Sequence, residues 1–136
     1  MGDEKARTAA HEMFDRDPAS KALGMELIEV GRGSAVVRMR ITESMVNGHG
    51  IAHGGFVFSL ADTAFACACN SHGPVTVAAG ADITFLRVVQ AGDLLEAQAT
   101  ERSTNGRSGL YDVTVSRGDE VVAEFRGRSR TIGKPT

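Results

Sequence analysis

The sequence is poor in cysteine, and the two cysteines it has cannot cross-link each other. Cys67 and Cys69 are the only ones among 136 residues, and both lie in an apolar run. If that run is helical, side chains two positions apart point about 200° apart and cannot form a disulfide. We therefore interpret both as small buried hydrophobic residues in a reducing compartment.

An excess of one charge, an apolar region near the N-terminus and long apolar runs are also lacking. The 15 Lys and Arg residues against 17 Asp and Glu residues give a formal net charge of -2, which argues against a nucleic acid partner. The N-terminus has no apolar segment after its charges, and no run reaches the ~18 residues that a membrane span needs. We expect one cytoplasmic domain, residues 1–136, with no membrane partner.

Common catalytic and cofactor motifs are missing as well. The sequence has no GxSxG, P-loop or GxGxxG pattern, and its Cys-x-Cys lacks the spacing of a zinc site. A cysteine nucleophile is not expected, because neither thiol has a histidine at a neighbouring helical position. We predict that the protein uses no metal and no cofactor.

The apolar pattern predicts two helices and six strands. Residues 3–14 have apolar side chains at helical spacing, and Pro18 ends this pattern within an N-terminal helical segment, residues 1–20. Residues 56–69 form an Ala-rich apolar run, for which we predict a helix enclosed by packed structure on every side. The order indicates an α+β fold in which an antiparallel sheet curves around this helix. Strands are expected at 25–30, 34–41, 75–88, 93–103, 108–117 and 120–132.

A glycine-rich segment precedes the predicted central helix. Residues 43–55 hold four of the 16 glycines and end in His53, Gly54 and Gly55. A helix N-terminus presents unpaired N–H groups, and glycines let a ligand oxygen approach the backbone, so an oxyanion hole is plausible here. The glycines could equally serve only to turn the chain into the helix. A structural role is as credible for His53, and is the better interpretation for His11, His49 and His72.

One carboxylate interrupts the apolar run. Besides the two thiols, Asp62 is the only ionisable side chain in residues 56–69, and no Lys or Arg lies three or four positions away. Such a charge is costly unless it is hydrogen-bonded or partly neutralised. A structural carboxylate bonded to backbone amides is one explanation. A functional carboxylate is somewhat favoured, because unpaired buried carboxylates cluster at active sites.

The spacing of Gly55 and Asp62 predicts a site shared between subunits. Seven helical residues place them on nearly the same face but ~10 Å apart along the axis. A general base and an oxyanion donor must each lie within ~3 Å of atoms one or two bonds apart. Two such helices, antiparallel across a twofold axis, would bring Asp62 of one subunit near Gly55 of the other. We therefore predict a homo-oligomer that is at least a dimer.

A longer pattern contains these residues. Asn47-Gly48-His49-Gly50 leads to HGGFVFSLADTAFA at 53–66, and ITFLRVVQAGDLLEAQA, GLYDVTV and FRGRSRTIG follow. From about Leu23 to Gly133, the chain resembles the PaaI-type hotdog thioesterases associated with phenylacetate degradation. The motif HGG with an aspartate at this interval, inside matching flanks, is specific.

The resemblance implies a hotdog fold and a homotetramer built as a dimer of dimers. It also implies hydrolysis of an acyl-CoA substrate, with phenylacetyl-CoA and its ring-hydroxylated derivatives as the favoured class. Coenzyme A is then part of the substrate. By position, Asp62 would be general base or nucleophile, the amide of Gly55, with that of Gly54, would polarise the thioester carbonyl, and Asn47 and His53 would orient the reacting groups.

Further residues are implied or suggested as substrate contacts. Ser59 could hydrogen-bond to Asp62 or to substrate, and Arg87 is a candidate for the CoA phosphates. Many relatives hold the attacking water with Ser or Thr early in the strand after the helix, where this chain has Ala78-Ala79-Gly80; Thr76 or Thr63 could replace it. Other candidates are Arg107, Arg126 and Arg128 for phosphate, and Phe56, Phe58 and Phe65 for an acyl pocket, although core packing is the commoner role of aromatic residues.

Two alternatives to thioester hydrolysis remain at this stage. A hotdog hydratase or dehydratase would use a histidine and an acid across the dimer, and the pair of His53 and Asp62 does not exclude it. A non-catalytic acyl-CoA-binding protein would use the same cavity without any reaction. Release of free thiol distinguishes hydrolysis from both.

Overall fold

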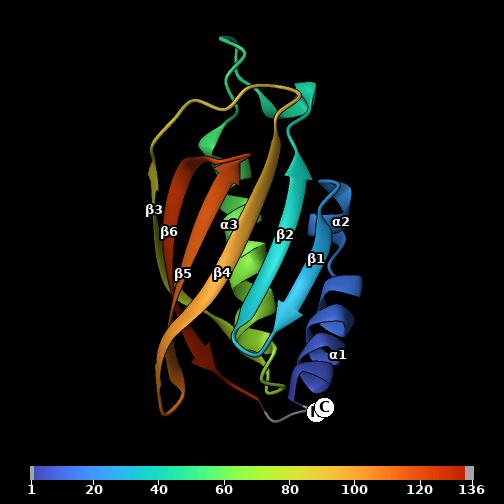
Figure 1. Cartoon of the computed structure of the whole chain (residues 1–136), viewed down its shortest axis with the longest axis vertical. Helices are drawn as coiled ribbons and strands as arrows, with labels where there is room; N and C mark the ends of the chain where they lie inside the picture. The colour runs from blue at the N-terminus through green and yellow to red at the C-terminus, as the bar shows by residue number, and fades with distance from the viewer. Residues whose placement is uncertain (1, 134–136) are drawn as a thin grey trace.

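A six-stranded antiparallel sheet wraps around one long helix, α3 (Gly54–Asn70), in the computed structural model, which describes residues 2–133 (Figure 1). The strand order is β1-β2-β4-β5-β6-β3, so β1 and β3 form the edges. This is the α+β hotdog architecture expected from the sequence. The elements are α1 (Gly2–Asp15), α2 (Pro18–Ala22), β1 (Glu26–Gly31), β2 (Ser34–Arg40), η1 (Glu43–Met45), α3, β3 (Thr76–Phe85), β4 (Leu94–Asn105), β5 (Ser108–Arg117) and β6 (Glu120–Thr131).

The central helix begins two residues earlier than the apolar run predicted. Gly54 and Gly55 form its first turn, and His53 is the N-cap residue with an extended backbone. At the other end, the Asn70 side chain donates to the carbonyl of Thr76 and accepts from its N–H, at 2.9 and 3.0 Å. These two hydrogen bonds form where the backbone bonds of α3 end, and they fix the direction in which the chain enters β3.

The N-terminal segment contains a second short helix that the sequence analysis missed. Pro18 does not simply end the helical pattern, because it occupies the first turn of α2. A proline lacks only an N–H that would be unpaired in this position. Asp17 is the N-cap, and its carboxylate accepts from the N–H of Ser20 at 3.0 Å. In Figure 1, α1 and α2 lie beside the edge strand β1.

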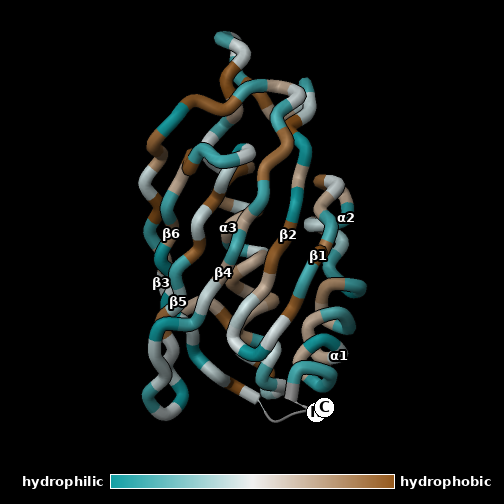
Figure 2. Tube along the Cα trace, in the orientation of Figure 1, coloured by the Kyte–Doolittle hydropathy of each residue, from teal (hydrophilic) through white to brown (hydrophobic). Residues whose placement is uncertain are grey.

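The core lies between α3 and the concave face of the sheet. Phe65 from α3 packs against the rings of Tyr111 and Phe125, with centroids 5.5 and 5.8 Å away. Gly127 on β6 lies directly under Phe65. The strands carry alternating apolar and polar residues, as Figure 2 shows along the sheet, so each strand turns one face to this core.

The sheet does not cover the whole of α3. Gly55, Ser59, Asp62 and Ala66 recur at helical spacing, and all four are exposed or partly buried, whereas Leu60, Ala61 and Ala64 are fully buried. The sequence predicted a helix packed on every side. In the single chain this face of α3 remains partly accessible instead.

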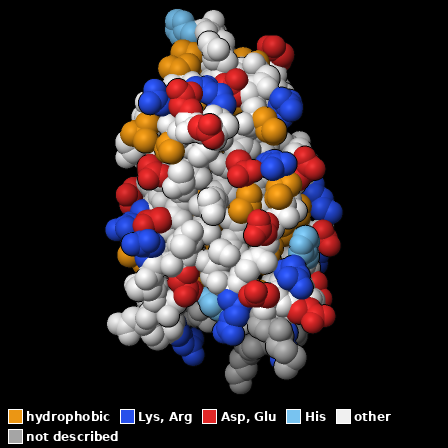
Figure 3. Space-filling view, in the orientation of Figure 1, with side chains coloured by type: hydrophobic (Ala, Val, Ile, Leu, Met, Phe, Trp, Pro, Cys, Tyr) orange, Lys and Arg blue, Asp and Glu red, His pale blue; other side chains and the backbone are white. Residues whose placement is uncertain are grey.

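The outer surface mixes charges of both signs. Figure 3 shows acidic and basic side chains interspersed over one face of the molecule. Ion pairs join neighbouring strands, such as Arg38 with Glu96 at 2.9 Å and Arg126 with Asp112 at 2.7 Å. Within residues 2–133, no helix combines the length and the apolar character that crossing a bilayer requires.

Substitution Gly127→Ala tests the close packing of α3 on β6. An added Cβ would lie 2.8 Å from three atoms of the Phe65 ring, so the ring or the strand must move. We expect a loss of about 1–3 kcal/mol in the free energy of unfolding, measured by denaturant titration. Gly48→Ala is the control, since a Cβ there meets nothing within 4 Å; equal effects of the two changes would contradict this packing.

Candidate active site

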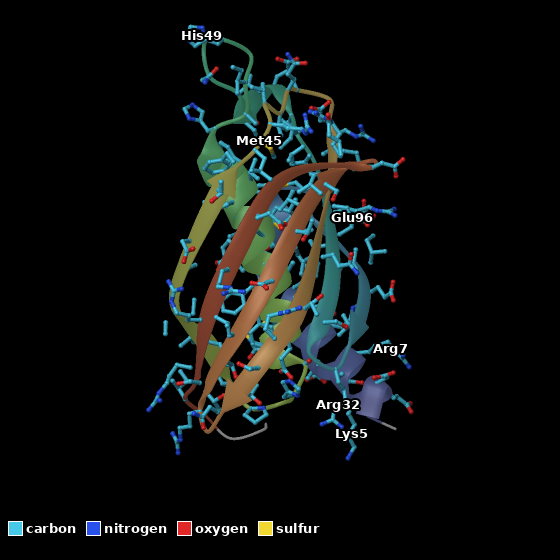
Figure 4. The ribbon with its side chains drawn as sticks, turned by 60° about the vertical axis from the view of Figure 1, so that its left-hand side comes forward. Lys5, Arg7, Arg32, Met45, His49 and Glu96 are labelled. Carbon is cyan, nitrogen blue, oxygen red and sulfur yellow. The ribbon has the colours of Figure 1, made fainter. Side chains whose placement is uncertain are left out.

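The loop before α3 is organised by Asn47. Its side-chain oxygen accepts from the backbone N–H groups of His49 and Ile51 at 2.9 and 3.1 Å. The backbone N–H of Asn47 donates to the carbonyl of Ile51 at 2.8 Å. The side-chain oxygen of Asn47 therefore holds the loop, and its side-chain NH₂ group can donate to another partner. Figure 4 shows His49 at the tip of the loop, pointing away from the body of the molecule.

The first turn of α3 has no side-chain cap. The His53 N–H donates to the carbonyl of Met45 at 2.9 Å, but the His53 side chain makes no capping hydrogen bond. The amides of Gly54 and Gly55 are among the first N–H groups of the helix, where no intrahelical acceptor exists. Gly55 is exposed and a Cβ there would meet nothing within 4 Å. This end of the helix can therefore accept an oxygen atom bearing negative charge.

Asp62 is partly buried on the uncovered face of α3. Burial, and then the negative charge of Asp17, raise the pKa of the Asp62 carboxyl above its ordinary value. Among residues 2–133, no hydrogen bond or positive charge lowers the pKa again. Such a carboxylate holds a proton more tightly than usual and is correspondingly a stronger base.

Two hydroxyls next to Asp62 have partners elsewhere. The Ser59 hydroxyl donates to the carbonyl of Gly55 at 2.8 Å. The Thr63 hydroxyl is buried and lies 2.9 Å from the Ser20 hydroxyl. Neither is bonded to Asp62, and Ser59 can donate to a substrate only by turning away from the Gly55 carbonyl. Asp62 itself is partly buried, and among residues 2–133 its carboxylate has no hydrogen-bond partner.

The two thiols of α3 are unsuited to nucleophilic attack. Cys67 and Cys69 are free and buried. Burial is the main reason that the pKa of each thiol is raised to about 12. At neutral pH both are therefore protonated, and a thiol is a poor nucleophile without its anion.

A mostly apolar cavity lies beside the start of α3. Its volume is about 380 Å³, and Gly54, Phe85 and Arg87 are among its lining residues. The Phe85 ring covers Gly54 so closely that a Cβ there would lie 2.7 Å from it. Arg87 pairs with Glu120 at 3.5 Å and remains largely exposed. The remaining lining residues are Ile51, Ala52, Val57, Leu86, Val88, Val89 and Val122.

The three phenylalanines of α3 differ in their surroundings. Phe65 is buried in the core, and Phe58 packs edge-on against Phe125 with centroids 5.2 Å apart. Phe56 is partly buried at the start of the helix. Phe58 is also partly buried, but Phe56 directly follows Gly55 and is the phenylalanine nearest to it along the helix.

The other candidates are distant from Asp62 or already paired. Thr76 follows α3 at its far end, where its hydroxyl donates to the carbonyl of Pro74; Asn70, its partner there, is eight residues or ~12 Å beyond Asp62. Arg107 lines a separate cavity at that far end. Arg126 and Arg128 pair with aspartates on the outer face of the sheet. Arg87 is thus the candidate arginine nearest the start of α3.

Gly55 and Asp62 lie in a region of the chain that matches a known protein family. Residues 49–124, more than half of the chain, match the model of the thioesterase superfamily. The chain belongs to the thioesterase superfamily. The matched region includes Gly55 and Asp62, and the predicted thioesterase class of this enzyme is confirmed.

Individual relatives support a closer relationship. The chain is 48% identical over 130 residues to the acyl-coenzyme A thioesterase PaaI of Escherichia coli, covering 95% of this chain and 93% of that protein. The solved structure of the E. coli PaaI protein from the phenylacetic acid degradation operon superposes with a TM-score of 0.96, at 46% identity and 99% coverage of both chains. A variant of the phenylacetic acid degradation protein PaaI from Thermus thermophilus gives 0.82, at 37% identity, covering 85% of this chain and all of that one. The resemblance to PaaI-type thioesterases is confirmed.

Asp17 is the neighbour of Asp62 that the sequence analysis missed. It precedes Asp62 by 45 positions, and no periodicity links the two. The sequence did contain one signal: Asp17, Pro18 and Ser20 form a typical helix start, with an N-cap acid before a first-turn proline. That signal predicts α2, but only the folded chain brings it to α3.

Asp62→Asn should stabilise the protein at pH 7. Because the folded-state pKa is raised, ionised Asp62 lowers the free energy of unfolding above that pKa; the cost disappears below the unfolded-state pKa, near 3.8. We expect a higher Tm for the variant at pH 7, and a difference that shrinks as the pH falls towards 4. An equal or lower Tm at pH 7 would contradict the described environment.

Proposed function

We propose that this thioesterase hydrolyses acyl-CoA thioesters, favouring phenylacetyl-CoA and its ring-hydroxylated derivatives, with Asp62 as general base or nucleophile. The observation that carries the proposal is the Asp62 carboxylate, whose pKa is raised by burial and by Asp17 and which has no partner among residues 2–133. It lies on the partly accessible face of a helix whose start has no side-chain cap. An acyl-CoA substrate is proposed because the similar Escherichia coli protein is an acyl-coenzyme A thioesterase. A general base and an oxyanion-binding helix start are compatible with hydrolysis of such a thioester. The two free thiols fit a reducing compartment, and the cytoplasm remains our prediction.

In the general-base route, Asp62 removes a proton from a water molecule as the water oxygen bonds to the thioester carbon. The carbonyl oxygen becomes an oxyanion, which the Gly55 amide stabilises. When the tetrahedral intermediate collapses, the C–S bond breaks and the CoA thiolate takes up the proton from Asp62. In the nucleophile route, an Asp62 oxygen bonds to the carbonyl carbon, CoA leaves, and water hydrolyses the mixed anhydride.

The Asp62 carboxylate and the Gly55 amide of one proposed site must come from two subunits. Gly55 and Asp62 are seven residues apart on one helix, ~10 Å along the axis, whereas both must reach one carbonyl group. We propose a dimer with two shared sites, in which the uncovered faces of α3 approach each other, and a tetramer made of two such dimers. A helix face carrying Gly55, Asp62 and Ala66 has the small side chains that close approach requires.

Other residues would position the substrate. The free amide group of Asn47 and the uncapped side chain of His53 flank the start of α3 and would orient the thioester. Gly54, Phe56 and the apolar cavity would receive the acyl thioester, and Ser59 would donate to it after leaving the Gly55 carbonyl. Arg87 at the cavity rim would bind a CoA phosphate.

Substitution of Asp62 tests the proposed reaction. We expect Asp62→Asn to lower kcat for phenylacetyl-CoA by about 10² to 10⁴, because a positioned base contributes that much. Thiol release, followed with a thiol reagent, is the measurement. No thiol release by the wild type would leave a hydratase or a binding protein. Full activity of the variant would remove Asp62 from the mechanism. Heavy oxygen from labelled water in the Asp62 side chain after one turnover would establish the nucleophile route.

A matched pair of substitutions at Gly55 tests the oxyanion donor. Gly55→Pro removes the N–H in the first helical turn, where proline is tolerated, and should lower kcat by about 10²–10³. Gly55→Ala keeps the N–H and adds a Cβ in open space. It should retain most of the activity, provided that the partner subunit leaves the same space. Equal activity of the two variants would argue against the Gly55 amide.

Mixing the two inactive variants tests the shared site. In a heterodimer of Asp62→Asn and Gly55→Pro subunits, one site carries both substitutions and the other carries neither. Random reassociation should therefore restore about a quarter of wild-type activity. If both groups act within one subunit, the mixture stays inactive.

A further inference from the structure

The connection between α1 and α2 is joined by hydrogen bonds to the turn of α3 that carries Asp62. The Asp17 carboxylate accepts from the N–H of Ser20 at 3.0 Å and from the Ser20 hydroxyl at 2.6 Å. The Ser20 oxygen lies 2.9 Å from the hydroxyl of Thr63, the residue after Asp62. Three side chains from two distant parts of the sequence thus form one continuous chain of hydrogen bonds.

The carboxylate at one end fixes the direction of these bonds. An ionised carboxylate only accepts, so Ser20 donates its single hydroxyl proton to Asp17. The Thr63 hydroxyl must then donate to Ser20. Ser20 and Thr63 are only 2% and 8% exposed, so water competes little for either hydroxyl. Hydrogen bonds that end on a charge are among the stronger ones in proteins.

We propose that Asp17 is a positioning residue of the active site: through Ser20 and Thr63, its carboxylate fastens the N-terminal segment to α3 and fixes a second negative charge near Asp62. The inference rests on the proposed function of Asp62 as the base. It gives the N-terminal segment an indirect part in the reaction, through Thr63 and through the charge of Asp17.

Among the described residues, Asp17 is the only charged group that shifts the pKa of the Asp62 carboxyl. On α3, burial raises the pKa of Cys67 and Cys69 to about 12, and on β5 burial raises that of Tyr111, so all three are neutral near pH 7. The charge of Asp17 also acts on Cys67, and that of Asp62 on Cys69. The buried residues of the other packed elements are uncharged: Ala6, Ala10 and Phe14 on α1, Val30 on β1, Ala35, Val37 and Met39 on β2, Leu95, Ala97 and Ala99 on β4, and Val122, Ala123 and Phe125 on β6.

A second carboxylate changes the pH range in which the base works. Two nearby negative charges repel each other, so Asp62 holds its proton more tightly while Asp17 is ionised. Asp62 is then a stronger base, and its reactive ionised form is lost at a higher pH than it would be without Asp17. The acid limb of the kcat/KM profile therefore depends on Asp17.

Asp17→Asn and Asp15→Asn form the test pair. Each change removes one negative charge from the same segment, but Asp15 is exposed and lies at the end of α1. Asparagine is also a good N-cap, so α2 should persist. We expect the acid limb of kcat/KM for phenylacetyl-CoA to move to lower pH in Asp17→Asn, with a plateau several-fold lower. Asp15→Asn should match the wild type. Ser20→Ala keeps the charge of Asp17 but removes the hydroxyl that holds its carboxylate. Its acid limb should lie between those of the wild type and Asp17→Asn.

A direct titration separates this inference from the proposed function. The carbon-13 signal of the Asp62 carboxyl, identified by its loss in Asp62→Asn, reports its pKa without any need for activity. A lower pKa in Asp17→Asn than in Asp15→Asn supports the inference. An unchanged pKa, or an acid limb that stays in place, overturns it even if Asp62 is the base. Full activity of Asp62→Asn would instead refute the proposed function and leave the effect of Asp17 on the pKa measurable.

Discussion

The close packing of α3 against the sheet requires small side chains on both sides of the contact. The helix contributes alanines such as Ala61 and Ala64, which are fully buried, and β6 contributes Gly127 beneath the Phe65 ring. Because a helix is round and the sheet curves around only part of it, one face remains accessible. Asp62 lies on that face. The position of the carboxylate, half in the core and half outside, follows from this geometry.

The start of the same helix carries the second group of the proposed site. Asn47 uses its side-chain oxygen to hold the preceding loop, and His53 enters the helix with an extended backbone and no cap. A helix with such a start has outward-facing amides and the positive end of its dipole. The rise of the helix then separates Gly55 from Asp62 by more than one carbonyl group can span. That distance, a property of every α-helix, is the reason for proposing a site shared between two subunits.

The electrostatics near Asp62 are unusual because no residue in the described range 2–133 offers its carboxylate a positive charge or a hydrogen bond. On the outer sheet face, carboxylates such as Asp112 have arginine partners that lower their pKa, first of all by hydrogen bonding. Asp62 instead has burial and the like charge of Asp17. Both effects oppose stability and increase basicity, which is the trade-off expected of a group kept for chemistry rather than for folding.

The sequence by itself determined the α+β order, the strands and the identity of Asp62, Gly54 and Gly55 as candidates. These depend on local periodicity, on glycine and on a charge in an apolar run, all of which are visible along the chain. Only the tertiary structure decided what surrounds Asp62. It placed Asp17 and Ser20 beside Thr63 and left Thr76 at the far end of α3. Contacts between positions 43 or more apart depend on how α2 packs against α3, and no local pattern encodes that packing.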